Sequence, residues 1–257
     1  MESREGADPA PGSERTGISP APRVSVILPT YNERASLEQF DPELQQVLLP
    51  LAAEIVVVDD ASPDGTAEWA RRATGPVAHR VLERKGVRGL ASAVWEGIRA
   101  ARGSVVVVMD ADGSHDPSAI PEMVEPILAG RAEFVLGSRW GRGGTAGGLA
   151  GSRRVISRGA QLLARPVVRA GDPMSGFFAV RRDVALRVPL APRGFKIGLE
   201  ILVRSRPDPV LEVPIRFRPR IAGESKLGGR EMREYLWQLA GLYRARVTEG
   251  RTASRTR

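Results

Sequence analysis

The sequence Ser104-Val-Val-Val-Val-Met-Asp-Ala-Asp-Gly-Ser-His-Asp-Pro117 joins a short apolar, β-branched run to two carboxylates, Asp110 and Asp112. The run from Val105 to Met109 is too short to cross a membrane and has no helical period, so it predicts a strand buried on both faces of a parallel sheet. Such sheets place their chemistry at the carboxyl ends of the strands. We therefore expect a functional site around the two carboxylates.

Asp110 and Asp112 are two positions apart, so both side chains would point to one face of an extended strand and could share a divalent cation. Oxygen ligands suit Mg²⁺ or Mn²⁺, which are held by one or two carboxylates, several waters and the phosphates of a substrate. A calcium loop fits poorly, because His115 and Pro121 stand where it needs Gly and Glu. A nucleotide hydrolase would need a Gly-rich loop ending in Gly-Lys-Ser/Thr, which the sequence lacks. A solvated acidic turn is the remaining alternative.

The composition fits one α/β domain with appendages, since the chain has 257 residues and 42% of them are hydrophobic. It contains no cysteine and two histidines, which excludes a disulfide framework and disfavours a zinc site. The net charge of +8 favours an anionic partner: nucleic acid, a membrane surface or a phosphate-bearing substrate. No apolar stretch approaches the roughly twenty residues of a membrane span and no signal-peptide core is present, so we expect a soluble or peripheral protein.

The first half of the chain alternates apolar strands with helices. Residues 1–22 are rich in Pro, Ala, Gly, Ser and charge, and are predicted to be disordered. Strands are then expected at 24–29 and 54–60, and the βαβαβ order predicts a doubly wound, mostly parallel sheet. Tyr31 and Glu33 follow the first strand and suit a nucleobase, although a capped helix start with a packed tyrosine explains them equally well.

The second half adds a basic strand end, a glycine-rich loop and two amphipathic helices. The strand at 133–139 ends at Arg139, a candidate for balancing diphosphate charge, and residues 141–146 are interpreted as a mobile flap. The helices at 152–169 and 231–247 interleave arginines with apolar residues, as at a membrane surface, although a solvated basic face is the alternative for the first. A loop with Arg218, Arg220, Ser225 and Lys226 would hold anions if it folded over the acidic site. A domain of 23–247 and a basic tail of 248–257 complete the chain.

Seven motifs, spread over the whole expected domain, resemble one family. They are Leu28-Pro-Thr-Tyr-Asn-Glu-Arg34, Val58-Asp-Asp-Ala-Ser-Pro-Asp-Gly-Thr66, Met109-Asp-Ala-Asp-Gly-Ser-His115, Gly137-Ser-Arg139, Ile156-Ser-Arg-Gly-Ala160, Asp172-Pro-Met-Ser-Gly-Phe177 and Gly223-Glu-Ser-Lys-Leu-Gly228. In this order they resemble the dolichol-phosphate (polyprenol-phosphate) mannose synthases of the family 2 inverting glycosyltransferases. The resemblance implies a GT-A fold and metal-dependent transfer of mannose, with inversion, from GDP-mannose to a polyprenyl (dolichyl) monophosphate.

The resemblance also implies roles for individual residues. Carried over by motif, the donor nucleotide would be held by Pro29, Tyr31, Glu33, Val58, Asp60, Asp110, Ala111, Asp112, Arg139, Arg220 and Lys226. The acceptor phosphate would be held by Arg153, Ser157, Arg220, Ser225 and Lys226. The catalytic residues would be Asp110, Asp112 and Arg139. Asp110 and Asp112 would hold the Mg or Mn ion.

The sequence departs from some relatives at two points. Some have Gln where Ser114 stands, which leaves a third metal ligand unassigned, and others carry C-terminal transmembrane helices that are absent here. Membrane contact, expected at the cytoplasmic face, would then come from the amphipathic helices, the lipid substrate or a separate membrane subunit. The alternatives are a polyprenyl-phosphate glucosyltransferase or another family 2 glycosyltransferase, a membrane-binding scaffold, and a nucleic-acid-binding protein. The last is disfavoured because no nucleic-acid-binding module is recognisable.

Overall fold

The computed structural model describes residues 21–86, 88–140, 143–145, 151–168, 170–187, 196–222 and 229–253, without the side chains of 151–157, 229–231 and 247–253. The strands are β1 (Val24–Thr30), β2 (Ala53–Asp59), β3 (His79–Glu83), β4 (Val105–Val108), β5 (Phe134–Ser138), β6 (Phe178–Arg181) and β7 (Val210–Pro214). The α-helices are α1 (Arg34–Leu48), α2 (Thr66–Arg72), α3 (Leu90–Ala100), α4 (Ile120–Leu128), α5 (Gly151–Ala164), α6 (Arg182–Ala185), α7 (Ile197–Arg204) and α8 (Gly229–Ala253). Two 3₁₀ helices, η1 (Leu49–Leu51) and η2 (Pro117–Ala119), lie between them.

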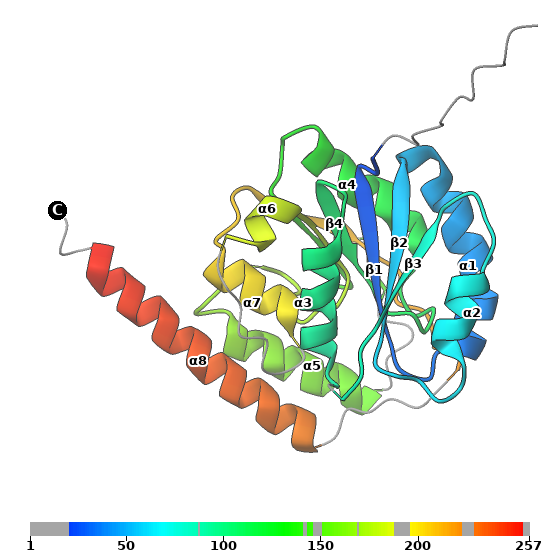
Figure 1. The fold of residues 1–257 in the computed structure, drawn as a ribbon. Coiled ribbons are helices and arrows are strands. Elements are labelled where there is room, and N and C mark those ends of the chain that lie inside the picture. Colours follow the sequence, from blue (N-terminus) through cyan, green and yellow to red (C-terminus); the bar gives the residue numbers. More distant parts are fainter. Residues whose placement is uncertain are drawn as a thin grey trace, which may run out of the picture.

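The strands form one seven-stranded sheet in the order β3-β2-β1-β4-β6-β5-β7 (Figure 1). The pairs β3–β2, β2–β1, β1–β4 and β5–β7 are parallel, whereas β6 runs antiparallel to both β4 and β5. The predicted mostly parallel α/β sheet is therefore confirmed. Because β1, β2 and β4 are parallel neighbours, their carboxyl ends meet at one edge.

Helices cover both faces of the sheet, which explains why the middle positions of the central strands are apolar. In β1, Val26 and Leu28 belong to the core shared with α1 and α4, while Ile27 belongs to the core under α3 and α7. All four valines of β4 are buried. A one-residue change of register would thus exchange the packing surfaces without exposing either face to water.

A third apolar cluster joins α5, α7 and α8 on one side of the sheet (Figure 1). Ala160 and Ala164 of α5 pack there with Leu199 of α7 and Tyr235 of α8. The Tyr235 hydroxyl donates to the carbonyl of Ala160 (2.7 Å). No helix among the described residues is both long and apolar enough to span a membrane.

Several element boundaries differ from the predicted ones. The helix predicted for 152–169 ends at Ala164, because the residue before Pro166 is sterically disfavoured in the helical conformation. The last helix continues to Ala253, through part of the predicted tail, because no proline interrupts it. Residues 1–20 and 254–257 of the predicted termini lie outside the described part of the chain.

Candidate active site at the acidic edge of the sheet

The ends of β1 and β2 are tied together by a buried carboxylate. Asp59 is fully buried and accepts hydrogen bonds from the Thr30 hydroxyl (2.8 Å) and from the Ser62 backbone (2.8 Å) and hydroxyl (2.6 Å). This arrangement fixes the two loops that carry the predicted nucleoside residues. Of these residues, Val58 points its side chain into the core, so only its backbone is available to a ligand.

Asp110 and Asp112 follow β4, but not on an extended strand. The strand ends at Val108, and residues 111–112 form a turn. The expected extended strand through Asp110 and Asp112 is therefore wrong, and the two carboxylates have different surroundings. The side chain of Asp110 is 34% exposed, whereas that of Asp112 is 5% exposed.

His115 stabilises this acidic turn through a hydrogen bond to the backbone of Asp110. The backbone N–H of Asp110 donates to its Nδ1 (3.0 Å), so that nitrogen is unprotonated. The ring is buried, stacks on Phe177 (5.0 Å between centroids) and meets the edge of Phe217 (5.7 Å). Burial lowers the pKa of His115, which keeps the imidazole neutral around pH 7. No role was predicted for His115, although an isolated histidine after an acidic turn was the available signal.

The segment after β7 folds over the acidic turn, which is the condition under which Arg220 was expected to meet anions. The guanidinium Nε of Arg220 pairs with Asp112 Oδ2 (3.1 Å), and the Ile221 N–H donates to the Asp112 carbonyl (3.0 Å). The side chain of Ile221 lies over Gly113, where an added Cβ would be 2.5 Å from Ile221 Cδ1. The acidic turn is thus covered by one cation and one apolar side chain. The neighbouring predicted anion ligands, Ser225 and Lys226, lie outside the described residues.

Glu33 extends the negative charge of the site toward the nucleoside side. Burial raises its pKa, and the nearby Asp112 and Asp110 raise it further, while the Ser36 hydroxyl (3.0 Å) and Arg220 act in the opposite direction. Within the described part of the chain, no group of three or more His, Cys, Asp or Glu side chains is arranged to hold a metal alone. Two carboxylates that share a cation with the phosphates of a substrate are nevertheless sufficient for Mg²⁺, so Asp110 and Asp112 fit such a metal.

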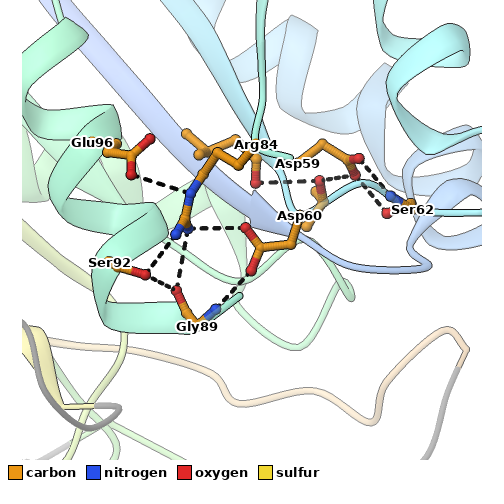
Figure 2. A network of polar contacts seen from close by, with 9 residues as sticks. Asp59, Asp60, Ser62, Arg84, Gly89, Ser92 and Glu96 are labelled. Atoms are coloured by element: carbon orange, nitrogen blue, oxygen red, sulfur yellow. Dashed lines mark hydrogen bonds and ion pairs between the residues drawn. The ribbon is translucent and has the colours of Figure 1, made fainter. Parts of the chain in front are cut away.

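Asp60, predicted to bind the nucleoside, is engaged by the loop between β3 and α3. Figure 2 shows Arg84 between Asp60 and the first turns of α3, with Nη1 2.9 Å from Asp60 Oδ1 and Nη2 donating to Ser92 Oγ (2.7 Å). The other carboxylate oxygen accepts from the Gly89 N–H (2.8 Å). Arg84 is buried, so it holds Asp60 and the loop in a fixed relation. The guanidinium carbon of Arg88, from the same loop, lies 4.4 Å from the centre of the Tyr31 ring.

Arg139, predicted to balance phosphate charge, is buried against Asp172. Its Nε and Nη2 donate to the two Asp172 oxygens (2.7 and 2.8 Å), and its backbone N–H donates to Oδ2 (3.1 Å). Gln161 of α5 donates to the same carboxylate (3.0 Å). Arg139 therefore donates three hydrogen bonds to one buried carboxylate beside the site. The side chains of Arg153 and Ser157, predicted to hold the acceptor phosphate, lie outside the described part of α5.

Comparisons with known proteins agree with the fold. The model for "Glycosyl transferase family 2" matches residues 25–188. A dolichol-phosphate mannosyltransferase of Pyrococcus furiosus is 44% identical over 232 residues, which are 89% of this chain and 65% of that protein. Relatives of the same name from Mycosarcoma maydis (39% identity; 92% of this chain, 84% of the relative) and Saccharomyces cerevisiae (37%; 85% and 86%) also match.

The solved structures that resemble this chain are more distant in sequence. Glucosyl-3-phosphoglycerate synthase from Mycobacterium tuberculosis, in complex with Mg²⁺ and uridine diphosphate, has a TM-score of 0.67 and 24% identity, and the match covers 87% of this chain and 80% of that one. This likeness concerns the fold. The chain spans 65% of the length of the Pyrococcus relative, so part of that protein has no counterpart here.

Proposed function

Because this chain belongs to the family 2 glycosyltransferases, with their GT-A fold, we propose that it transfers mannose from GDP-mannose to a polyprenyl (dolichyl) monophosphate. The observation that carries the proposal is the match of three dolichol-phosphate mannosyltransferases to 85–92% of the chain. The site supports it, since acidic and basic groups converge at the carboxyl ends of β1, β2 and β4. This is where open parallel sheets bind their ligands.

In this proposal, Asp110 and Asp112 hold a Mg²⁺ or Mn²⁺ ion together with the donor diphosphate. A divalent ion there would stabilise the negative charge of the departing nucleoside diphosphate. Asp112 is paired with Arg220 in the present structure (3.1 Å). Donor binding would let Arg220 exchange this carboxylate for a phosphate oxygen, since a guanidinium binds both kinds of anion.

The acceptor needs no general base, because a phosphate monoester is already anionic at neutral pH. Its oxygen forms the new bond to the anomeric carbon of mannose, while the bond from that carbon to the diphosphate oxygen breaks and its electron pair leaves with GDP. Attack from the side opposite the leaving group inverts the configuration and gives polyprenyl phosphate β-mannose. The site supports a reaction without a general base, because its histidine, His115, is buried and neutral and its Nδ1 accepts a hydrogen bond from the backbone N–H of Asp110.

We propose that α5 and α8 bring the site to a membrane surface, at its cytoplasmic face, where the lipid acceptor lies. Both helices leave large apolar side chains exposed: Leu162 (58%), Leu163 (48%), Leu236 (47%) and Trp237 (74%). Arg158 on α5 and Arg165 directly after it are exposed, and such a mixture favours anionic lipid surfaces. A separate membrane subunit is a further candidate partner for the same surface.

The first experiment mixes the purified protein with labelled GDP-mannose, a short polyprenyl monophosphate and Mg²⁺ or Mn²⁺. The proposal predicts that label moves into the organic phase, that a chelator abolishes the transfer and that added metal restores it. Transfer from GDP-glucose or UDP-glucose in place of GDP-mannose would contradict the proposed sugar. Transfer that persists after exhaustive chelation would contradict the proposed metal.

The membrane role is tested by sedimentation with vesicles of an anionic phospholipid. Trp237→Ser and Leu162→Ser should reduce the bound fraction, because each removes exposed apolar area from α8 or α5. Leu49→Ser is the matched control, since Leu49 is equally exposed (60%) but lies on η1. Equal losses in all three variants would contradict a localised membrane surface.

A further inference from the structure

A small cavity lies beside the acidic edge, between α3 and α7. Its polar lining includes Asp110, Ser175 and Lys196, and its apolar wall includes Leu90 and Ile197. The volume is about 20 Å³, which is room for roughly one water molecule. A sugar ring does not fit into such a space, but a single hydroxyl group does.

Lys196 occupies an unfavourable place in the fold for a lysine. It is the N-cap residue of α7, and its side chain makes no capping hydrogen bond to the first turn of this helix. A cation is disfavoured at this end of a helix, because the helix dipole is positive there. Desolvation and the neighbouring Arg139 lower the pKa of Lys196 to about 8. Its side chain nevertheless lines the cavity together with Asp110.

The lining of the cavity distinguishes between possible occupants. The Lys196 ammonium, oriented by a hydrogen bond to the Met174 carbonyl (2.7 Å), supplies donors, and the Asp110 carboxylate supplies acceptors. A hydroxyl group can accept from the first and donate to the second, and a whole phosphate group is too large for a space of about 20 Å³. Gly176 also lines this space, and an added Cβ there would make only ordinary contacts with Asp110 Oδ1 (3.7 Å) and His115 Cε1 (3.5 Å).

We propose that Lys196 is a specificity-determining residue that hydrogen-bonds one hydroxyl group of the transferred sugar in this cavity. The inference rests on the proposed function, since it requires a sugar-nucleotide donor at the acidic edge. It adds the residue that recognises the sugar itself rather than its nucleotide or phosphates. A site built to hydrogen-bond a hydroxyl strongly rejects the analogue that lacks it, because the protein groups are left unpaired.

The test compares equilibrium binding of GDP, GDP-mannose and four GDP-mannose analogues that lack the 2-, 3-, 4- or 6-hydroxyl. In the wild type, one analogue should bind about ten-fold or more weakly than GDP-mannose, as expected for a hydrogen bond to a charged group. Lys196→Met should weaken GDP-mannose binding by a similar factor and leave GDP binding within two-fold. That variant should bind the same deoxy analogue as well as it binds GDP-mannose. Lys196→Gln, which keeps a donor, should recover part of the loss.

Arg131→Met is the matched control, because it removes one positive charge from an exposed position outside the site. An equal loss of GDP and GDP-mannose affinity in Lys196→Met would overturn the proposal, and so would an effect confined to the KM of the lipid acceptor. If Lys196→Met does not fold, as judged by thermal unfolding, the wild-type series still decides: analogues that all bind like GDP-mannose would refute it.

Failure of the proposed function gives a different result. In that case the wild type transfers another sugar, and the same series is made with deoxy analogues of that sugar. Loss of one hydroxyl contact through Lys196 would then support the inference while the mannose assignment fails.

Discussion

Two carboxylate–guanidinium pairs stand next to the carboxyl ends of strands β4 and β5, and they differ in how completely the protein encloses them. In the Arg139–Asp172 pair the side chains are 9% and 0% exposed, and both carboxylate oxygens are bound by the guanidinium. In the Arg220–Asp112 pair they are 34% and 5% exposed, joined through Nε alone. The first, closed pair is shielded from solvent, whereas the second, open pair has a partner that reaches solvent.

The difference shows that a charged residue at a strand end is not a ligand-binding residue by virtue of its position alone. A buried ion pair persists because removal of one partner leaves the other charge uncompensated in a low-dielectric environment. A half-exposed pair contributes little, because water and other ions compete for both groups. We therefore assign a fixed structural contact to Arg139 and an exchangeable one to Arg220.

The largest expected effect comes from breaking the closed pair with Asp172→Asn. The change leaves the buried Arg139 without a counter-charge, and breaking such a pair costs about 3–5 kcal/mol in the free energy of unfolding. Urea denaturation followed by circular dichroism measures it. Asp183→Asn is the control, since it breaks an exposed pair with Arg181 (66% and 40% exposed) and should change stability by less than about 0.5 kcal/mol. A loss below about 1 kcal/mol for Asp172→Asn would mean that the closed pair is not needed for folding.

Asp112→Asn removes the negative charge of the open pair, and we expect it to lower the turnover rate rather than the stability of the fold. Removal of a group that stabilises charge in the transition state lowers kcat by about 10²–10³-fold, or roughly 3–4 kcal/mol. Stability should change by less than about 1 kcal/mol, because its partner Arg220 reaches solvent. The measurements are mannosyl transfer to the organic phase and urea denaturation of the same preparation. Activity within three-fold of the wild type would contradict the catalytic role of Asp112.

Arg220→Met removes the guanidinium of the open pair. If Arg220 moves from Asp112 to a donor phosphate, its loss should lower kcat/KM for GDP-mannose by about 10–100-fold, the range for a hydrogen bond to a charged group. Arg218→Met is the matched control in the same segment, because Arg218 pairs instead with Glu43 (2.8 Å) and Asp116 (2.9 Å). Equal losses of kcat/KM in the two variants would indicate that the segment needs positive charge in general rather than Arg220 in particular.

Much of the fold follows from local sequence pattern. The largely apolar segments at 24–29, 54–60 and 105–109 predicted the central parallel strands, because strands buried on both faces are mostly apolar. The antiparallel direction of β6 and the early end of β4 at Val108 were not predicted. Both depend on how distant segments pack, which a local pattern does not encode.

The site was predicted in its charges but not in its pairings. Asp110, Asp112 and Arg220 do converge in the described structure. The partner of Arg139 is 33 residues away in the chain, and no periodicity connects the two. Lys196 was missed for a similar reason, since it adjoins Asp110 only in the folded chain. Its position as a lysine before an apolar helix was the one local sign.

The smallest expected loss of stability comes from removing a neutral buried hydrogen bond, which serves as a reference for the charged pairs. Tyr235→Phe removes the hydrogen bond from the buried Tyr235 hydroxyl to the Ala160 carbonyl (2.7 Å) and keeps the ring in the cluster between α5 and α8. Burial raises the pKa of Tyr235 to about 12, so the hydroxyl is protonated at any assay pH near 7. A neutral hydrogen bond contributes about 1 kcal/mol, and urea denaturation should show a loss of that size. If Asp172→Asn costs no more than Tyr235→Phe, the closed pair behaves as an ordinary hydrogen bond. Arg139 would then be as exchangeable as Arg220 and free to meet the donor phosphates.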